Sequence, residues 1–180
     1  MDGMDVMDLA AFRARYPEWI AQARPWLQQK RWREGFAAFP YPVNPAAPWT
    51  PMVKPLAECR LALFSTAGLY IPGEQAAFDL ADEEGDPSFR ELPRGVDPAR
   101  LAIAHDHYDH ASARLDPDSV FPLRRLVELE RHGVIGELTP ILYSTSGYVP
   151  ALHRVVEETA PAIVASLKAQ AADAVLHVPV

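Results

Sequence analysis

The chain has 180 residues, a net charge of −7 and one cysteine, Cys59. This length suits one domain with an extension, and a lone cysteine excludes an internal disulfide or a cysteine-rich zinc site. The acidic balance argues against a nucleic-acid or polybasic membrane surface, because either needs an excess of Lys and Arg. No apolar run approaches the roughly 20 residues that span a bilayer, and the acidic start differs from a signal peptide. We therefore expect a soluble, cytoplasmic protein with no nucleic-acid or membrane partner.

Residues 1–55 are expected to form a helical arm and a proline-rich connection. Within residues 5–34, apolar side chains recur every three or four positions and so share one helix face. Pro17 and Pro25 each remove a backbone donor, so we expect two or three short helices there. Six prolines between Pro40 and Pro55 favour a stiff, extended connection, because each one also biases the preceding residue toward extended geometry.

Residues 56–180 are expected to form an α/β domain. Four apolar runs have the length and composition of buried strands, at residues 60–66, 100–105, 139–143 and 174–180. Helical spacing occurs at residues 121–132 and 152–171, with a kink or restart at Pro161 in the second segment. Apolar strands separated by amphipathic helices predict a parallel sheet covered by helices. We therefore predict a Rossmann-like or flavodoxin-like three-layer domain, preceded by the helical arm.

The densest group of reactive side chains runs from His105 to His110 and follows the predicted strand 100–105. Ligand sites of α/β folds lie outside the carboxyl ends of strands. Four residues of this group are therefore candidates for a substrate pocket: His105, His107, Tyr108 and Asp109. Tyr108 and the histidines could donate to a substrate carboxylate or transfer protons.

The same group contains HxHxDH, the metal signature of metallo-β-lactamase-like hydrolases. Imidazole and carboxylate ligands suit zinc. A zinc hydrolase is therefore an alternative, with its metal bound by His105, His107, Asp109 and His110. Such enzymes also need further ligands downstream.

Small residues follow two other predicted strands and are further candidates for the pocket. They are Ser65, Thr66 and Gly68 after the first strand, and Ser144 and Ser146 after the third. Tight turns favour the same residue types, so a purely structural role stays open.

An acidic stretch at residues 79–91 is expected to be a solvated loop with a turn at residues 86–89. Arg90 is the only base in this stretch. We expect it to pair with Asp86 or with the carboxylate of a ligand.

Five segments resemble the selenoprotein B subunit family of the glycine, sarcosine, betaine and D-proline reductases. They are GDPSFRELP (85–93), LAIAHDHYDH (101–110), VFPLRRLVELERHGVIGELTP (120–140), YSTSGY (143–148) and LKAQAADAVLHVPV (167–180). Their order and spacing match the family over about residues 56–180. The HxHYD segment of the family also accounts for the histidine cluster without a metallohydrolase fold.

The resemblance implies a subunit that acts within a reductase complex. In this family the substrate amine is held as an imine on a pyruvoyl group of a partner subunit. A selenocysteine or cysteine then attacks the α-carbon and displaces the nitrogen, and thiols restore the enzyme by exchange. The implied partners are the pyruvoyl-containing subunit, a thiol or selenol carrier protein and a small amine or amino-acid substrate. No cofactor is expected in this chain itself.

The resemblance places the redox residue directly after the strand AVLHVPV, in a pattern like U-x-x-C-H, and therefore after Val180. Cys59 lies elsewhere in the pattern and is no substitute. Because UGA encodes selenocysteine and is otherwise a stop codon, we expect that translation of this sequence stopped at that codon. The domain 56–180 would then be incomplete at its C-terminus, and its catalytic residue stays unknown.

We therefore predict a subunit or fragment of a reductase that cleaves the C–N bond of glycine, sarcosine, betaine or D-proline, with thiols as electron donors. The zinc hydrolase is one alternative. A non-catalytic domain that binds a partner is another. The choice among substrates depends on the shape of the pocket, which the sequence alone does not reveal.

Overall fold

The computed structural model describes residues 9–43 and 50–180. These residues form two compact units. One holds the N-terminal helices together with Ala151–His153, and the other holds Met52–Pro150 and Arg154–Val180. The division into an arm at residues 1–55 and a domain at residues 56–180 stays a prediction.

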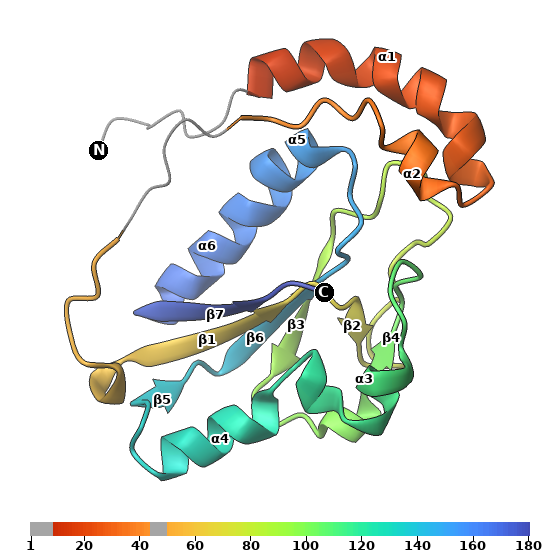
Figure 1. The fold of residues 1–180 in the computed structure, drawn as a ribbon. Coiled ribbons are helices and arrows are strands. Elements are labelled where there is room, and N and C mark those ends of the chain that lie inside the picture. Colours follow the sequence, from red (N-terminus) through yellow and green to blue (C-terminus); the bar gives the residue numbers. More distant parts are fainter. Residues whose placement is uncertain (1–8, 44–49) are drawn as a thin grey trace. The chain divides into compact units, whose positions relative to one another are not determined.

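The N-terminal unit is built on one long helix, α1 (Leu9–Gln28), followed by α2 (Trp32–Gly35) (Figure 1). The expectation of several short helices is wrong, because α1 continues through Pro17 and Pro25. Each internal proline costs about 3 kcal/mol, whereas each large apolar side chain contributes roughly 1.5–3 kcal/mol when buried. Burial of the apolar side chains on one face of α1 outweighs the cost of the two prolines. The buried residues of this helix are Phe12, Tyr16, Trp19, Ile20, Ala23 and Leu27.

The proline-rich connection has neither helix nor strand at residues 40–43 and 50–55. Its middle part, residues 44–49, lies outside the described residues. The expected extended geometry of that part stays a prediction.

The larger unit contains a sheet with β1 (Arg60–Ser65) at its centre. Three strands run parallel to β1: β5 (Glu137–Leu138), β6 (Ile141–Thr145) and β7 (Ala174–Val178). β7 pairs with one edge of β1 from Leu61 to Ser65, so β5 and β6 both pair with the other edge of β1. These strands confirm the predicted runs at 60–66, 139–143 and 174–180.

Helices cover both faces of this sheet. Leu142 of β6 packs in the same apolar cluster as Leu126 of α4 (Leu123–Arg131). The next residue, Tyr143, donates its hydroxyl to Ser166 of α6 (Ala160–Ala169), 2.7 Å away. Successive strand residues point to opposite faces, so α4 and α6 form the two outer layers (Figure 1). The predicted α/β class is confirmed, whereas the Rossmann-like or flavodoxin-like label stays a prediction.

The helix predicted at residues 152–171 is interrupted close to the expected place. α5 (Leu152–Arg154) passes into a π-helical turn at Val155–Thr159, and α6 begins directly after it. Pro161 then lies in the first turn of α6, where its missing N–H is tolerated.

Two segments differ from the sequence prediction. The run 100–105 contributes only β4 (Ala102–Ile103), which pairs with β2 (Leu69–Tyr70) in a separate antiparallel ribbon. The end of the acidic stretch forms β3 (Phe89–Pro93), which pairs antiparallel with β6. The main sheet is therefore mixed. α3 (Ala111–Leu115) and short 3-10 helices at Leu56–Glu58, Pro98–Arg100 and Pro117–Ser119 complete the unit.

We expect Leu63→Ala to destabilise the protein by about 2–5 kcal/mol, because it leaves a cavity at a fully buried position in the central strand. Urea unfolding followed by circular dichroism measures the change. Leu115→Ala is the matched control, since Leu115 is 89% exposed and its truncation should stay within about 0.5 kcal/mol. Equal effects of the two changes would contradict the assignment of the core.

Candidate functional site

The residues after β1 connect three parts of the larger unit through backbone hydrogen bonds. The Thr66 N–H donates to the Val178 carbonyl at the end of β7, at 3.1 Å. The Gly68 N–H donates to the Thr145 carbonyl at the end of β6, at 2.9 Å, and the Gly68 carbonyl accepts from the Ala104 N–H at 2.8 Å. The segment after β4 is therefore attached to the carboxyl edge of the main sheet.

Gly68 is the residue that permits this attachment. Its φ is +70°, a backbone conformation that glycine adopts without strain. A Cβ at this position would lie 2.5 Å from the Ala104 carbonyl oxygen and 2.9 Å from the Cβ of His105. Glycine is therefore needed at position 68 because Ala104 and His105 pack directly against it.

His105 is buried at this edge, with 3% of its surface exposed. Its Nδ1 accepts a hydrogen bond from the His107 backbone N–H at 3.1 Å, so the neutral ring carries its proton on Nε2. The Nε2 atom has no hydrogen-bond partner among the described residues. Burial, with a smaller contribution from His107, lowers the pKa of His105 to about 4. The ring is therefore neutral at pH 7.

His107 contacts an aromatic ring. It stacks on Tyr148 with 3.9 Å between ring centroids, and its Nδ1 lies 2.8 Å from Oδ1 of Asp106. Burial, together with the nearby negative charges of Asp106 and Glu83, raises the pKa of Tyr148 to about 12. Tyr148 was not predicted as a site residue, although it ends the YSTSGY segment.

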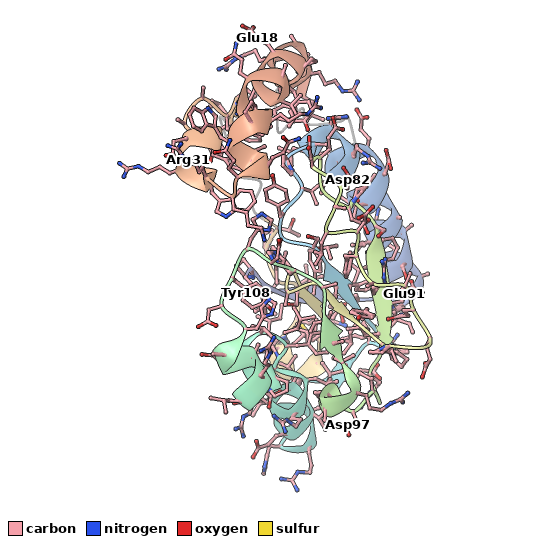
Figure 2. All side chains as sticks on the ribbon, turned by 90° about the vertical axis from the view of Figure 1, so that its right-hand side faces the viewer. Glu18, Arg31, Asp82, Glu91, Asp97 and Tyr108 are labelled. Carbon is pink, nitrogen blue, oxygen red and sulfur yellow. The ribbon has the colours of Figure 1, made fainter. Side chains whose placement is uncertain are left out.

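Tyr108, labelled in Figure 2, comes shortly before α3 and supports the histidines. Its ring lies edge-on to His105 and His110, with centroid distances of 5.1 and 4.5 Å. Its hydroxyl donates to the Ala67 carbonyl at 3.2 Å, and burial raises the pKa of Tyr108 to about 12. Tyr108 is therefore a neutral packing residue at pH 7.

The structure does not support the zinc site of the alternative prediction. Asp109 is exposed, and its carboxylate accepts from the Ala111 N–H at the start of α3. The rings of His107 and His110 pack against aromatic neighbours. In residues 9–43 and 50–180, no three His, Cys, Asp or Glu side chains are arranged to hold a metal ion.

Two of the serine candidates have structural roles. The Ser65 hydroxyl donates to the Val120 carbonyl at 2.7 Å and accepts from the Ala67 N–H, and Ser65 is fully buried. The Ser144 hydroxyl accepts from the Leu69 N–H at 2.8 Å and is equally buried. For both residues these hydrogen bonds account for the hydroxyl by a structural role.

A small hollow lies beside His105 and brings three of the candidates together. His105, His107 and Ser146 line it, along with side chains from the predicted acidic loop, Asp79 and Asp82. Its volume is about 10 Å³, which is roughly the space that one water molecule needs. The sequence signal for Asp79 and Asp82 was the acidic run, which by itself indicated only a solvated loop. Asp106 and Tyr148 complete the polar part of the wall.

Arg90 organises the loop that carries these aspartates. As predicted, it pairs with Asp86, at 3.9 Å. Its guanidinium also donates to the Ala76 and Ala77 carbonyls and lies 4.1 Å from the centre of the Phe78 ring. The loop is therefore an ordered wall of the site.

Gly147 packs closely against the Nε2 edge of His105, whose Nε2 atom is buried. A Cβ on Gly147 would lie 2.8 Å from Nε2 of His105, 3.0 Å from the Val180 carbonyl oxygen and 3.1 Å from the Thr66 carbonyl oxygen. Its φ is outside the left-handed region, so space is the reason that glycine is needed here. The Thr66 hydroxyl also accepts from the Val180 N–H at 2.9 Å, which brings the end of β7 to the same place.

The family model described as glycine/sarcosine/betaine reductase selenoprotein B matches residues 27–179. The chain belongs to this family. The resemblance that the sequence segments indicated is thereby confirmed. No solved structure matches.

Several curated relatives are named as reductase subunits or complex components. The D-proline reductase subunit gamma of Acetoanaerobium sticklandii is 33% identical over 75% of this chain and 54% of its own length. The glycine reductase complex component B subunit gamma of Carboxydothermus hydrogenoformans is 30% identical over 76% of this chain and 32% of its own length. The sarcosine reductase complex component B subunit beta of Peptoclostridium acidaminophilum is 29% identical over 61% of this chain and 25% of its own length. The chain thus spans about half the length of these relatives or less.

No helix in the described part of the chain is long and apolar enough to cross a membrane.

We expect His105 to make the protein less stable as the pH falls from about 6.5 to 4. In this range the unfolded chain binds a proton at the ordinary histidine pKa of 6.5, whereas the folded state binds it only near pH 4. The unfolded state therefore binds more protons, so stability falls with pH, by about 3 kcal/mol at most from this group. Urea unfolding at pH 7.5 and 4.5 should show a smaller loss in His105→Gln than in the wild type. His132→Gln is the control, because it alters an exposed histidine, and it should lose as much stability between these pH values as the wild type does. If His105→Gln also loses as much stability as the wild type, the burial of a neutral His105 ring is contradicted.

Proposed function

We propose that this chain is a subunit or fragment of a selenoprotein B-type reductase that reductively cleaves the C–N bond of a small amine or amino acid. The observation that carries the proposal is the family match over residues 27–179, which includes every strand of the main sheet. The arrangement at the carboxyl edge of this sheet supports it, because buried polar groups and a small hollow lie where α/β folds bind their ligands.

The candidate substrates are those in the names of the family and its relatives: glycine, sarcosine, betaine and D-proline. As the sequence resemblance implies, we propose that the chain works with a pyruvoyl-containing subunit and a thiol or selenol carrier protein. In the net reaction a C–H bond replaces the C–N bond of the substrate. The nitrogen leaves as ammonia from glycine and as an amine from sarcosine or betaine, whereas cleavage of D-proline opens its ring and keeps the nitrogen in the product. A dithiol supplies the two electrons and two protons and becomes a disulfide.

We propose that the redox selenocysteine or cysteine follows the strand β7. Cys59 is unsuited to this role, because it is 2% exposed and its thiol donates to the Pro55 carbonyl at 3.3 Å. A residue after Val180 would start near Thr66 and Gly147, at the same edge as His105. Thr66, His105, His107 and Ser146 are the proposed pocket residues among the original candidates.

The intact gene product, isolated with the subunits that copurify with it, is expected to cleave the C–N bond of at least one of glycine, sarcosine, betaine and D-proline. Mass spectrometry of the reduced product and titration of thiols should show one dithiol oxidised for each C–N bond broken. Omitting the dithiol or alkylating the complex beforehand should abolish the reaction. If the partner subunits and dithiol are present and none of the four substrates is cleaved, the proposed function is wrong.

A further inference from the structure

The strand β7 is an outer strand of the main sheet, but it has the composition of an interior strand. Within residues 9–43 and 50–180 it pairs only with β1 (Figure 1). Its sequence is AVLHV, with no Asp, Glu, Lys, Arg or Pro, and its register with β1 contains no bulge. Outer strands usually carry charges, prolines or bulges, because their free N–H and C=O groups otherwise pair with another strand. The free edge of β7 therefore lacks the usual protection.

The opposite outer strand, β3, has this protection. It is also five residues long, and it contains Arg90, Glu91 and Pro93. Only Leu92 of β3 is buried. The same sheet thus ends on one side in a strand with charges and a proline, and on the other side in an apolar strand without them.

The described residues leave both faces of β7 partly open. His177 pairs with Phe64 and stacks on its ring, with 4.6 Å between ring centroids, and Phe64 pairs with Tyr143. Because Tyr143 contacts α6, Val175 and His177 lie on the α6 face and Leu176 lies on the α4 face. Val175 is 43% exposed and Leu176 is 37% exposed. Parallel strands are ordinarily covered on both faces, so β7 lacks a covering layer that its composition calls for.

The family comparisons indicate where that cover comes from. The family match extends to residue 179 and therefore includes β7. The chain spans about half the length of its curated relatives or less. The longer relatives therefore have further residues to place around the strand that they share with this chain.

The connection from β6 to β7 predicts the path of such a segment. It passes from one side of β1 to the other on the face of α6. Crossovers between parallel strands are right-handed in nearly all cases, so a further step in the same direction keeps its connection on the same face. A helix in that connection would cover Val175 and His177 next to α6. The strand after the helix would pair with the free edge of β7.

We propose that the part of the gene product that follows Val180 crosses over on the α6 face and returns as a strand parallel to β7. The choice of the same polypeptide as the occupant rests on the proposed function, in which the redox residue follows β7. In the intact protein β7 is then an interior strand. The loop after β7, with the redox residue, lies between two strands of the carboxyl edge and no longer at the margin of the sheet.

Hydrogen–deuterium exchange of the intact gene product, resolved to single amides, tests the pairing. We expect every amide from Val175 to Val178 to exchange at least about 100-fold more slowly than in an unfolded peptide, because both edges of β7 are hydrogen-bonded. The amides of β1, which has strands on both sides, are the internal standard. Fast exchange at alternate amides of β7 would show an open edge and would overturn the proposal.

The source of the cover is tested in the same experiment. The protection should be present in the gene product without its partner subunits, and it should not depend on protein concentration. Protection that appears only with the partner subunits would assign the edge to one of them. Protection that grows with concentration would assign it to a second copy, and either result would overturn the proposal.

A substitution tests the cover over the α6 face. Val175→Lys should lower the urea midpoint of the intact gene product by about 1 M or more, because the crossover would bury the ammonium group. Val53→Lys is the matched control, since Val53 is 93% exposed, and its midpoint should stay within about 0.3 M of the wild type. If Val175→Lys does not fold, Val175→Thr should still have a lower midpoint than Val53→Thr. Equal midpoints at the two positions would show that Val175 is open to solvent, and the proposal would be wrong.

The outcomes separate this proposal from the proposed function, because pairing is measured without turnover. If β7 is protected by its own polypeptide in a complex that cleaves no C–N bond, only the reductase function is refuted. If the complex cleaves a substrate while β7 keeps an open edge, only the interior position of β7 is refuted.

Discussion

Backbone hydrogen bonds at the end of β1 hold together segments that are far apart in the sequence. They join Thr66 to β7, and Gly68 to both β6 and Ala104. The last of these depends on a side chain being absent, because a Cβ on Gly68 would collide with the Ala104 carbonyl. His105 reaches the carboxyl edge of the main sheet through this approach, since its own strand, β4, belongs to a different ribbon.

The elements that the sequence predicted well are those with one strong local signal. β1, β6 and β7 are apolar runs bounded by turn residues, and α4 begins after Pro122 and ends before Gly133. The pairing of residues 100–105 could not be predicted, because a short apolar run does not specify its partner strand. The unbroken α1 was missed because local rules assign a cost to Pro17 and Pro25, whereas the gain comes from burial in the folded unit.

Some of the predicted site residues lie together in the structure, and others have structural partners of their own. Placing candidates at strand ends selected His105 and Ser146, which line one hollow. It also selected Ser65 and Ser144, whose hydroxyls form hydrogen bonds with backbone groups. Chain order cannot show where a hydroxyl points or which partner it meets. The role of Gly147 was equally hidden, because a glycine after a strand ordinarily indicates only a turn. Its importance follows from the close approach of its backbone to His105, Thr66 and Val180.

Burial keeps His105 neutral near pH 7, and the hydrogen bond from the His107 N–H to Nδ1 places the ring proton on Nε2. The most direct test of this account is nitrogen NMR of the protein labelled with ¹⁵N at its histidines, with His105→Gln to identify the His105 signals. We predict the neutral Nε2–H tautomer of His105 from pH 5.5 to 8. An Nδ1–H tautomer, or protonation at the ordinary histidine pKa of 6.5, would contradict the account.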